Sequence, residues 1–194
     1  YTLSLHDALP IYAGRFFQQA GADIVKIEAT EGYLDVVREV SKAGMAVMAH
    51  LGIRPQSVTL AGALKAQGMT AQNGLSLITL AERMVEAGAS LLLLEGVARE
   101  VARIITSRVE VPVVSCGSGP DCDGQVLVIS DILGLCEGKM PKFSQKFANI
   151  GTEITKAAAE YSKQVKSGQF PDDEHSYHIK VDELERLNGM LNPS

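Results

Sequence analysis

A short junction that recurs three times is the feature that most constrains how this chain folds. Ala-Gly-Ala or Ala-Gly-Met stands at residues 20–22, 43–45 and 87–89, each time directly before an apolar run. Glycine commonly ends helices because it accepts the left-handed backbone conformation, so each junction predicts a helix end followed by a buried strand. The repetition indicates successive β/α units, which build a parallel sheet.

Apolar runs and helical spacing place the expected elements. Strands are predicted at 22–28, 46–51, 90–95 and 111–116. Apolar residues recur at helical spacing before Gly44, over 75–85 and near 98–107. Residues 125–135 fit either a strand or a helix, whereas 144–167 predict a long amphipathic helix ended by Gly168. A polar surface connection over 170–178 and a last helix near 181–188 follow.

Ionisable side chains stand where three of the predicted strands end. Lys26 and Glu28 close the first strand, His50 closes the second, and Glu95 follows four leucines at the end of the third. Lys26 and Glu28 have the same parity and so project from the same face of their strand. Because α/β enzymes place their chemistry at the carboxyl ends of strands, these residues are candidates for an active site.

Each candidate also has a purely structural interpretation. Lys26 and Glu28 can neutralise each other, and His50 can be a core histidine with satisfied hydrogen bonds. Glu95 can form an ion pair with Arg99 or Arg103. The functional interpretations are that Glu28 coordinates a hard divalent cation, Lys26 meets a substrate carboxylate, and burial raises the pKa of Glu95 toward a range useful for proton transfer.

Composition excludes several classes of partner. The formal net charge is −5 and no basic stripe is present, so nothing in the sequence supports nucleic-acid binding. No apolar run approaches the roughly 20 residues of a membrane span. The three cysteines, Cys116, Cys122 and Cys136, have no zinc-ligand spacing and favour a reducing compartment, so we expect a cytoplasmic protein. We also expect small-molecule partners and a homo-oligomer.

Two segments have alternative interpretations. Gly117–Gly124 is a glycine-rich turn after a buried strand; it either binds an anion through backbone N–H groups or packs closely at the rim of the sheet, and the second is favoured. Residues 1–12 are interpreted as a non-native segment that resembles translated sequencing adapter, the alternative being a genuine amphipathic arm, and residues 13–194 as the domain. His6 and Asp7 are therefore not assigned to a site.

Five separated segments together resemble the ketopantoate hydroxymethyltransferase family. They are Val25–Glu28, Met48–Val58, Leu93–Glu95, Gly119–Val128 and Phe170–Tyr177. The resemblance implies a (β/α)8 TIM barrel of the phosphoenolpyruvate mutase and isocitrate lyase superfamily. It also implies transfer of a one-carbon unit from 5,10-methylenetetrahydrofolate to the α-keto acid 3-methyl-2-oxobutanoate, which gives 2-dehydropantoate in pantothenate and coenzyme A biosynthesis.

The resemblance also assigns roles to the candidate residues. The lysine at the Lys26 position contacts the keto acid, Glu28 helps to hold Mg²⁺, Glu95 transfers the proton, and His50 lies near the substrate. Departures from the family pattern are Ala29-Thr30 after Glu28, Gly96 after Glu95, and Ser130 before Asp131.

The length of the chain adds a further expectation. A (β/α)8 barrel takes about 250 residues, whereas this chain has 194. No counterpart of the family's amino-terminal strands is found, so we expect a carboxyl-terminal part of the barrel that is not active by itself. The alternatives are a non-catalytic barrel fragment or assembly subunit, and a superfamily lyase that cleaves a C–C bond.

Overall fold

A computed structural model describes residues 5–55, 65–135, 138 and 140–191 of the chain. They form two compact units, Tyr1–Ile132 with Gly138–Gln145, and Leu133–Glu137 with Lys146–Ser194. The first unit contains the sheet and all the residues proposed above for the site.

The first unit is built on one parallel sheet of five strands in the order of the sequence. The strands are β1 (Ile24–Glu28), β2 (Ala46–Gly52), β3 (Leu91–Glu95), β4 (Val113–Cys116) and the short β5 (Gly124–Gln125). The first four confirm the strands predicted from the apolar runs, to within two residues at either end. Sequential parallel neighbours are the arrangement that repeated β/α units produce.

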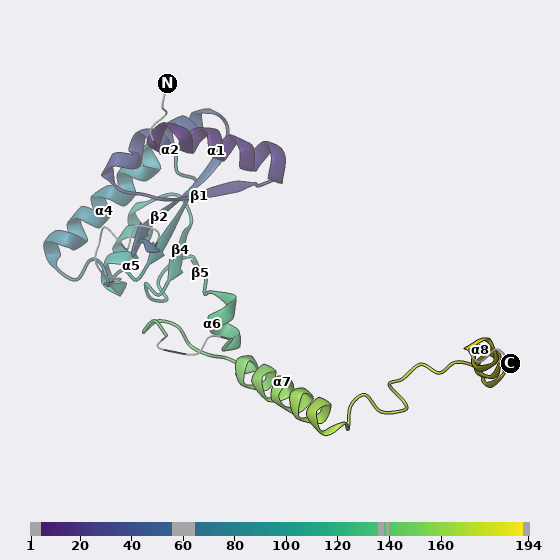
Figure 1. The fold of residues 1–194 in the computed structure, drawn as a ribbon. Helices are drawn as coiled ribbons and strands as arrows, with labels where there is room; N and C mark the ends of the chain where they lie inside the picture. The colour runs from purple at the N-terminus through teal and green to yellow at the C-terminus, as the bar shows by residue number, and fades with distance from the viewer. Residues whose placement is uncertain (1–4, 56–64, 136–137, 139, 192–194) are drawn as a thin grey trace. The chain divides into compact units, whose positions relative to one another are not determined.

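Helices connect the strands and cover the sheet (Figure 1). They are α1 (Leu5–Ala20), the 3₁₀ helix η1 (Glu31–Tyr33), α2 (Leu34–Lys42), α4 (Ala71–Glu86) and α5 (Arg99–Arg108). The side chain of Thr70 caps α4 by accepting a hydrogen bond from the backbone N–H of Asn73, 3.2 Å away. The predictions of helices before Gly44, over 75–85 and near 98–107 are confirmed.

The two faces of the sheet differ in what they carry. Val47, Leu92 and Val113 are fully buried in a core shared with the apolar sides of α2, α4 and α5. Since side chains alternate along a strand, the residues directly before and after each of these in its own strand project from the opposite face. That opposite face carries the charged residues at the strand ends.

Helix α1 was not predicted from the sequence. Its residue Ala13 is buried, and Leu9 and Phe17 pack partly against the core. The expected division after residue 12 falls inside this helix, and the origin of residues 1–12 stays a prediction.

Residues 125–135, which fitted either a strand or a helix, contain the end of a strand and a short helix. β5 ends at Gln125, and the helix α6 covers Ile129–Leu133. The prediction of a helix from 144 is wrong in its start, because α7 covers Ile150–Ser167 and Phe147 lies outside it, largely exposed. Ser144 instead donates a hydrogen bond to the carboxylate of Asp131, 2.8 Å away, in a non-helical turn.

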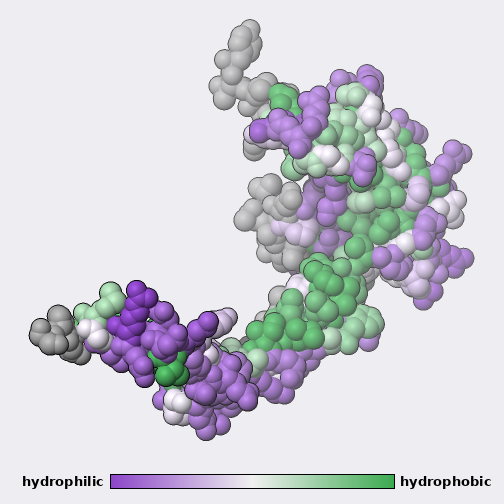
Figure 2. Space-filling view, turned by 90° about the vertical axis from the view of Figure 1, so that its right-hand side faces the viewer, coloured by the Kyte–Doolittle hydropathy of each residue, from purple (hydrophilic) through white to green (hydrophobic). Residues whose placement is uncertain are grey.

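The second unit contains α7 and α8 (Val181–Leu191). Gly168 ends α7 in the left-handed conformation, with φ of 70°, as predicted. Residues 170–178 form the expected exposed connection. Neither helix buries a residue. Figure 2 shows mainly hydrophilic residues toward the C-terminal end of the chain. Within the described part of the chain, no helix is both long and apolar enough to cross a membrane.

Candidate active site

The strand register brings the four predicted residues to one face of the sheet. Glu28 of β1 is paired with His50 of β2, and Gly52 at the end of β2 is paired with Glu95 of β3. Paired residues in parallel strands project from the same face. Lys26, two residues before Glu28, projects from that face as well. The sequence prediction that these side chains come from neighbouring strand ends is therefore consistent with the structure.

Glu95 and His50 form the centre of the site. The Nε2 atom of His50 lies 3.2 Å from the Oε2 atom of Glu95, although the angles are not those of a hydrogen bond. The side chain of His50 is 2% exposed and that of Glu95 is 17% exposed. The alternative pairing of Glu95 with Arg99 is not found, because Arg99 binds Asp121, with 2.7 Å between Nε and Oδ2.

Burial shifts the pKa values of this pair in opposite directions. Burial raises the pKa of Glu95, and the negative charge of Glu28 adds to that effect while the positive charge of Lys26 opposes it. Burial also lowers the pKa of His50, and Lys26 lowers it further. Both shifts favour the uncharged forms. The pair can therefore hold a proton on Glu95 at a higher pH than a solvated carboxyl group does.

Lys26 and Glu28 lie on the more open part of the same face. Lys26 is exposed and Glu28 is half-buried. Both act electrostatically on Glu95 and on His50. An exposed ammonium group on this face is placed to meet an anionic group of a small molecule.

A complete metal centre is not formed by the residues that the structure describes. Among them, no group of three or more histidine, cysteine, aspartate or glutamate side chains converges on one point. Mg²⁺ requires near-octahedral oxygen ligands, of which Glu28 supplies at most one carboxylate. The described residues therefore do not by themselves fit a Mg²⁺ site. Cys116 and Cys122 are free thiols, and Cys136 lies outside the described residues.

A cavity of about 720 Å³ opens beside Glu95. Its walls are mostly apolar and come from the segments that follow β2, β3 and β4; among the lining residues are Ile53, Met69, Gly96, Gly117, Met140 and Phe143. Lys142, which is exposed, also lines it. A cavity of this size accommodates a cofactor-sized organic molecule.

The glycine-rich turn packs closely, as the favoured interpretation predicted. Gly117 has φ of 74°, and a Cβ atom there would lie 2.1 Å from the ring of Phe143. A Cβ atom on Gly119 would lie 2.6 Å from Cγ of Arg99. Both contacts need glycine, so this turn shapes the wall of the cavity beside Glu95.

Sequence reasoning missed two buried serines next to the site. Ser118 and Ser115 are almost completely buried, and hydrogen bonds join them to each other and to the segment around Glu95. The available indication was a small polar residue between two glycines after an apolar strand. That pattern also fits an exposed turn, so the sequence alone does not reveal the burial.

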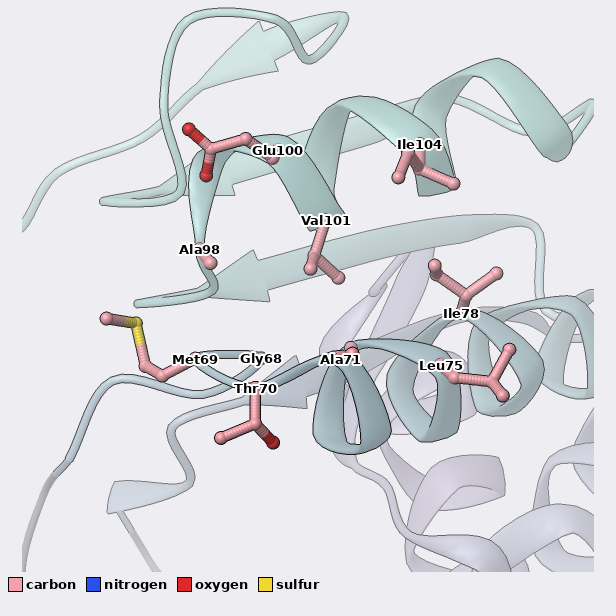
Figure 3. A pocket seen from close by; sticks show the side chains of 11 residues that line it. Gly68, Met69, Thr70, Ala71, Leu75, Ile78, Ala98, Glu100, Val101 and Ile104 are labelled. Carbon is pink, nitrogen blue, oxygen red and sulfur yellow. The ribbon is translucent and has the colours of Figure 1, made fainter.

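A second, smaller cavity of about 350 Å³ lies between α4 and α5 (Figure 3). Leu75 and Ile78 on α4 face Val101 and Ile104 on α5 across it. It contains none of the four predicted site residues, and its walls are apolar except at Thr70 and Glu100. It is therefore not a candidate for the chemistry at the strand ends.

Comparison with known proteins gives one consistent family. The sequence model described as ketopantoate hydroxymethyltransferase matches residues 1–173. A 3-methyl-2-oxobutanoate hydroxymethyltransferase of Syntrophobacter fumaroxidans is 40% identical over 98% of this chain and 67% of its own length. Proteins of the same name from Syntrophomonas wolfei and Moorella thermoacetica are each 42% identical, over 63% and 65% of their lengths and 90% and 91% of this chain. The chain thus spans about two thirds of the length of these curated relatives.

The raised pKa of Glu95 predicts a pH-dependent effect of Glu95→Gln on stability. Above the ordinary glutamate pKa, the folded protein binds more protons than the unfolded chain, so this group lowers the free energy of unfolding as pH rises up to its folded pKa. Glu95→Gln removes this pH-dependent decrease in the free energy of unfolding. The melting temperature of the variant relative to the parent should therefore be higher at pH ~7.5 than at pH ~4.5.

The exposed Glu110 offers a matched control. Glu110→Gln removes a carboxylate outside the site and should show no comparable rise with pH in thermal melts. A difference between Glu95→Gln and the parent that stays constant across this pH range would contradict the assigned direction of the pKa shift.

Proposed function

Because the chain belongs to the ketopantoate hydroxymethyltransferase family, we propose that it carries the proton-transfer part of a hydroxymethyltransferase. The reaction transfers a one-carbon unit from 5,10-methylenetetrahydrofolate to 3-methyl-2-oxobutanoate and gives 2-dehydropantoate. The observation that supports this most directly is a half-buried carboxylate, Glu95, which lies 3.2 Å from a buried imidazole and lines an apolar cavity. This arrangement suits the removal of a proton from carbon next to a carbonyl group.

Each residue of the site has a defined task in this proposal. Lys26 binds the carboxylate of the keto acid through its ammonium group. Glu95, as the carboxylate, accepts the proton from C3 of the keto acid, which leaves an enolate. His50 is neutral because burial lowers its pKa, so an N–H of its ring can donate a hydrogen bond to a substrate oxygen without adding a charge.

The cavity beside Glu95 is the proposed site of the folate co-substrate. Its apolar walls and the ring of Phe143 suit a flat heteroaromatic ring, and Lys142 suits the carboxylates of a glutamate tail. Carbon–carbon bond formation then follows at the boundary between this cavity and the charged face. The enolate carbon attacks the methylene carbon of the carrier, one of its two C–N bonds breaks, and the freed nitrogen takes the proton that Glu95 had accepted. Water then adds its oxygen to the same carbon as the second C–N bond breaks and passes a proton to the second nitrogen, which gives the hydroxymethyl product and tetrahydrofolate.

Glu28 is the one residue of this chain that we propose as a Mg²⁺ ligand. The described residues do not form a complete metal site, so we assign Glu28 as one ligand and leave the others to the part of the relatives that this chain does not span. No step above depends on the ion.

The proposed architecture extends the observed sheet. Five consecutive parallel strands with connecting helices agree with part of a (β/α)8 barrel. The remaining strands are proposed to belong to the part of the relatives that this chain does not span. On the same proposal, residues 13–194 form part of the barrel domain together with its carboxyl-terminal helices, and the enzyme is a cytoplasmic homo-oligomer.

Replacement of the proposed base tests the function. The test protein combines this chain with the part of the Syntrophobacter fumaroxidans relative that the chain does not span. In this complemented protein, the C3 proton of 3-methyl-2-oxobutanoate should exchange with deuterated solvent, and NMR measures the rate of that exchange. Glu95→Gln should slow this exchange by about 100-fold or more, because a general base contributes that much. Glu110→Gln should exchange at the parent rate.

Three outcomes would reject the proposal. Exchange by Glu95→Gln at the parent rate would remove Glu95 from the chemistry. A complemented protein that folds but exchanges no proton would favour the non-catalytic fragment. Cleavage of a C–C bond in the keto acid would favour the lyase.

The role of Glu28 predicts how Mg²⁺ binds. Isothermal titration of the chain by itself should show no saturable binding, because one carboxylate does not hold the ion. The complemented protein should bind Mg²⁺ in the presence of the keto acid, and Glu28→Gln should weaken that binding. Equal affinities of Glu28→Gln and the parent would remove Glu28 from the ligand set.

Gly117→Ala tests the co-substrate cavity. The added methyl group would clash with the ring of Phe143 and displace it from the cavity wall. Calorimetry should show weaker binding of tetrahydrofolate, with the keto acid exchange still present. Gly44→Ala is the matched control, because its φ of 83° carries similar backbone strain and a Cβ atom there meets no atom within 4 Å. Equal affinity for tetrahydrofolate in the two variants would place the co-substrate elsewhere.

A further inference from the structure

Ser118 connects the turn after β4 to the backbone on both sides of Glu95. Its hydroxyl group donates a hydrogen bond to the carbonyl oxygen of Leu94 at 2.8 Å. The same hydroxyl accepts one from the N–H of Val97 at 2.9 Å. The residue before Glu95 and the residue two positions after it are therefore bound to a single side chain.

Gly96 follows Glu95 directly, and its carbonyl oxygen accepts a hydrogen bond from the N–H of Gln67 at 2.9 Å. Gly96 has φ of 56°, a conformation that glycine adopts easily and from which it also departs easily. Backbone hydrogen bonds hold part of this segment: Ile53 N–H donates to Glu95 O at 2.8 Å, and Gly96 N–H donates to Cys116 O at 2.9 Å. They leave the Val97 N–H to the side chain of Ser118.

Ser118 is itself held in place by a second serine. Its backbone N–H donates to the hydroxyl oxygen of Ser115, 2.9 Å away on β4. Both residues are at most 1% exposed. A buried hydroxyl group is unfavourable unless it is hydrogen-bonded, and that of Ser118 both donates and accepts a hydrogen bond. The serine pair therefore adds side-chain hydrogen bonds to the sheet pairing that joins the ends of β3 and β4.

We propose that Ser118 is a positioning residue for Glu95, holding the end of β3 so that the carboxylate stays against His50 and the cavity. The inference rests on the proposed role of Glu95 and adds a residue that makes no contact with the reacting groups. Ser118 acts only through the backbone of residues 94–97. Its loss should change the environment of the Glu95 carboxylate as well as the stability of the fold.

Ser118→Ala tests this in the chain as it stands, without substrate. Loss of the hydroxyl group leaves the buried Val97 N–H without its partner, so hydrogen exchange of that amide should accelerate by about tenfold or more. The carboxyl carbon of Glu95, followed by NMR during a pH titration, should show a pKa that moves down toward the ordinary glutamate value, as the end of β3 loosens and water reaches the group. The other ionisable groups that act on Glu95 or lie beside it are unchanged in this variant; they are Lys26, Glu28, His50 and Cys116, which is paired with Glu95 on β4.

Ile105→Val separates positioning from general loss of stability. Ile105 is fully buried in α5, and its replacement destabilises the fold without changing the contacts of Glu95. Ile105→Val should leave the pKa of the Glu95 carboxyl group unchanged. An unchanged titration in Ser118→Ala, or the same shift in Ile105→Val, would overturn the proposal.

A measurement on the parent chain keeps the test decisive if Ser118→Ala does not fold. The Val97 amide should then be protected from exchange as strongly as the amides of β3, and fast exchange would overturn the proposal. Because no keto acid is used, these results do not depend on the exchange assay. Failure of the proposed function and failure of the positioning role are therefore distinguished.

Discussion

The register of the parallel strands is the constraint on which the site depends. Glu28 is paired with His50, and Gly52 is paired with Glu95, so the polar groups at the ends of β1, β2 and β3 share one face. A slip of one residue in β2 would turn His50 into the apolar core and Leu51 onto the site face. The buried valines and leucines of the opposite face oppose such a slip, because it would expose them. Burial of the core residues thus keeps the polar side chains of the candidate site on the same face of the sheet.

Desolvation then sets the protonation of the central pair. Glu95 and His50 lie within ion-pair distance, yet burial disfavours the charged form of each. Lys26 pulls the pKa of Glu95 down, but its side chain is exposed and water screens its charge. The raised pKa of Glu95 is the net result. A base of this kind accepts a proton more readily than a solvated carboxylate, which suits the abstraction of a weakly acidic proton.

The sequence predicted those parts of the fold that depend on local pattern. Apolar runs located β1 to β4, and Gly168 located the end of α7. Parity predicted the shared face of Lys26 and Glu28. The start of α7 was placed too early because Phe147 fits the apolar spacing of the helix, whereas Ser144 bonds to Asp131, thirteen residues earlier. Contacts of that kind depend on the path of the chain between the two residues, which periodicity does not describe.

The same limit applies to the residues around Glu95. An arginine four residues after a carboxylate on a predicted helix start is a reasonable ion-pair partner, and the sequence left Arg99 open as one. In the structure, Arg99 instead pairs with Asp121, which lies on the turn after β4. The serine that supports Glu95 lies on the same turn. Neither contact has a local sequence pattern, because each joins two different βα units.

The turn after β4 therefore controls Glu95 in two independent ways. Asp121 engages Arg99, and Gly119 allows the stem of Arg99 to lie directly against the backbone. Were Arg99 to pair with Glu95 instead, the guanidinium charge would lower the pKa of the carboxyl group and oppose the effect of burial. Ser118, two residues before Pro120, binds the backbone on both sides of Glu95. One residue of the turn thus keeps a cation away from the proposed base, and another holds the base in place. The turn that lines the cavity through Gly117 thus also supports the position of Glu95 through Ser118, while burial raises the pKa of its carboxyl group.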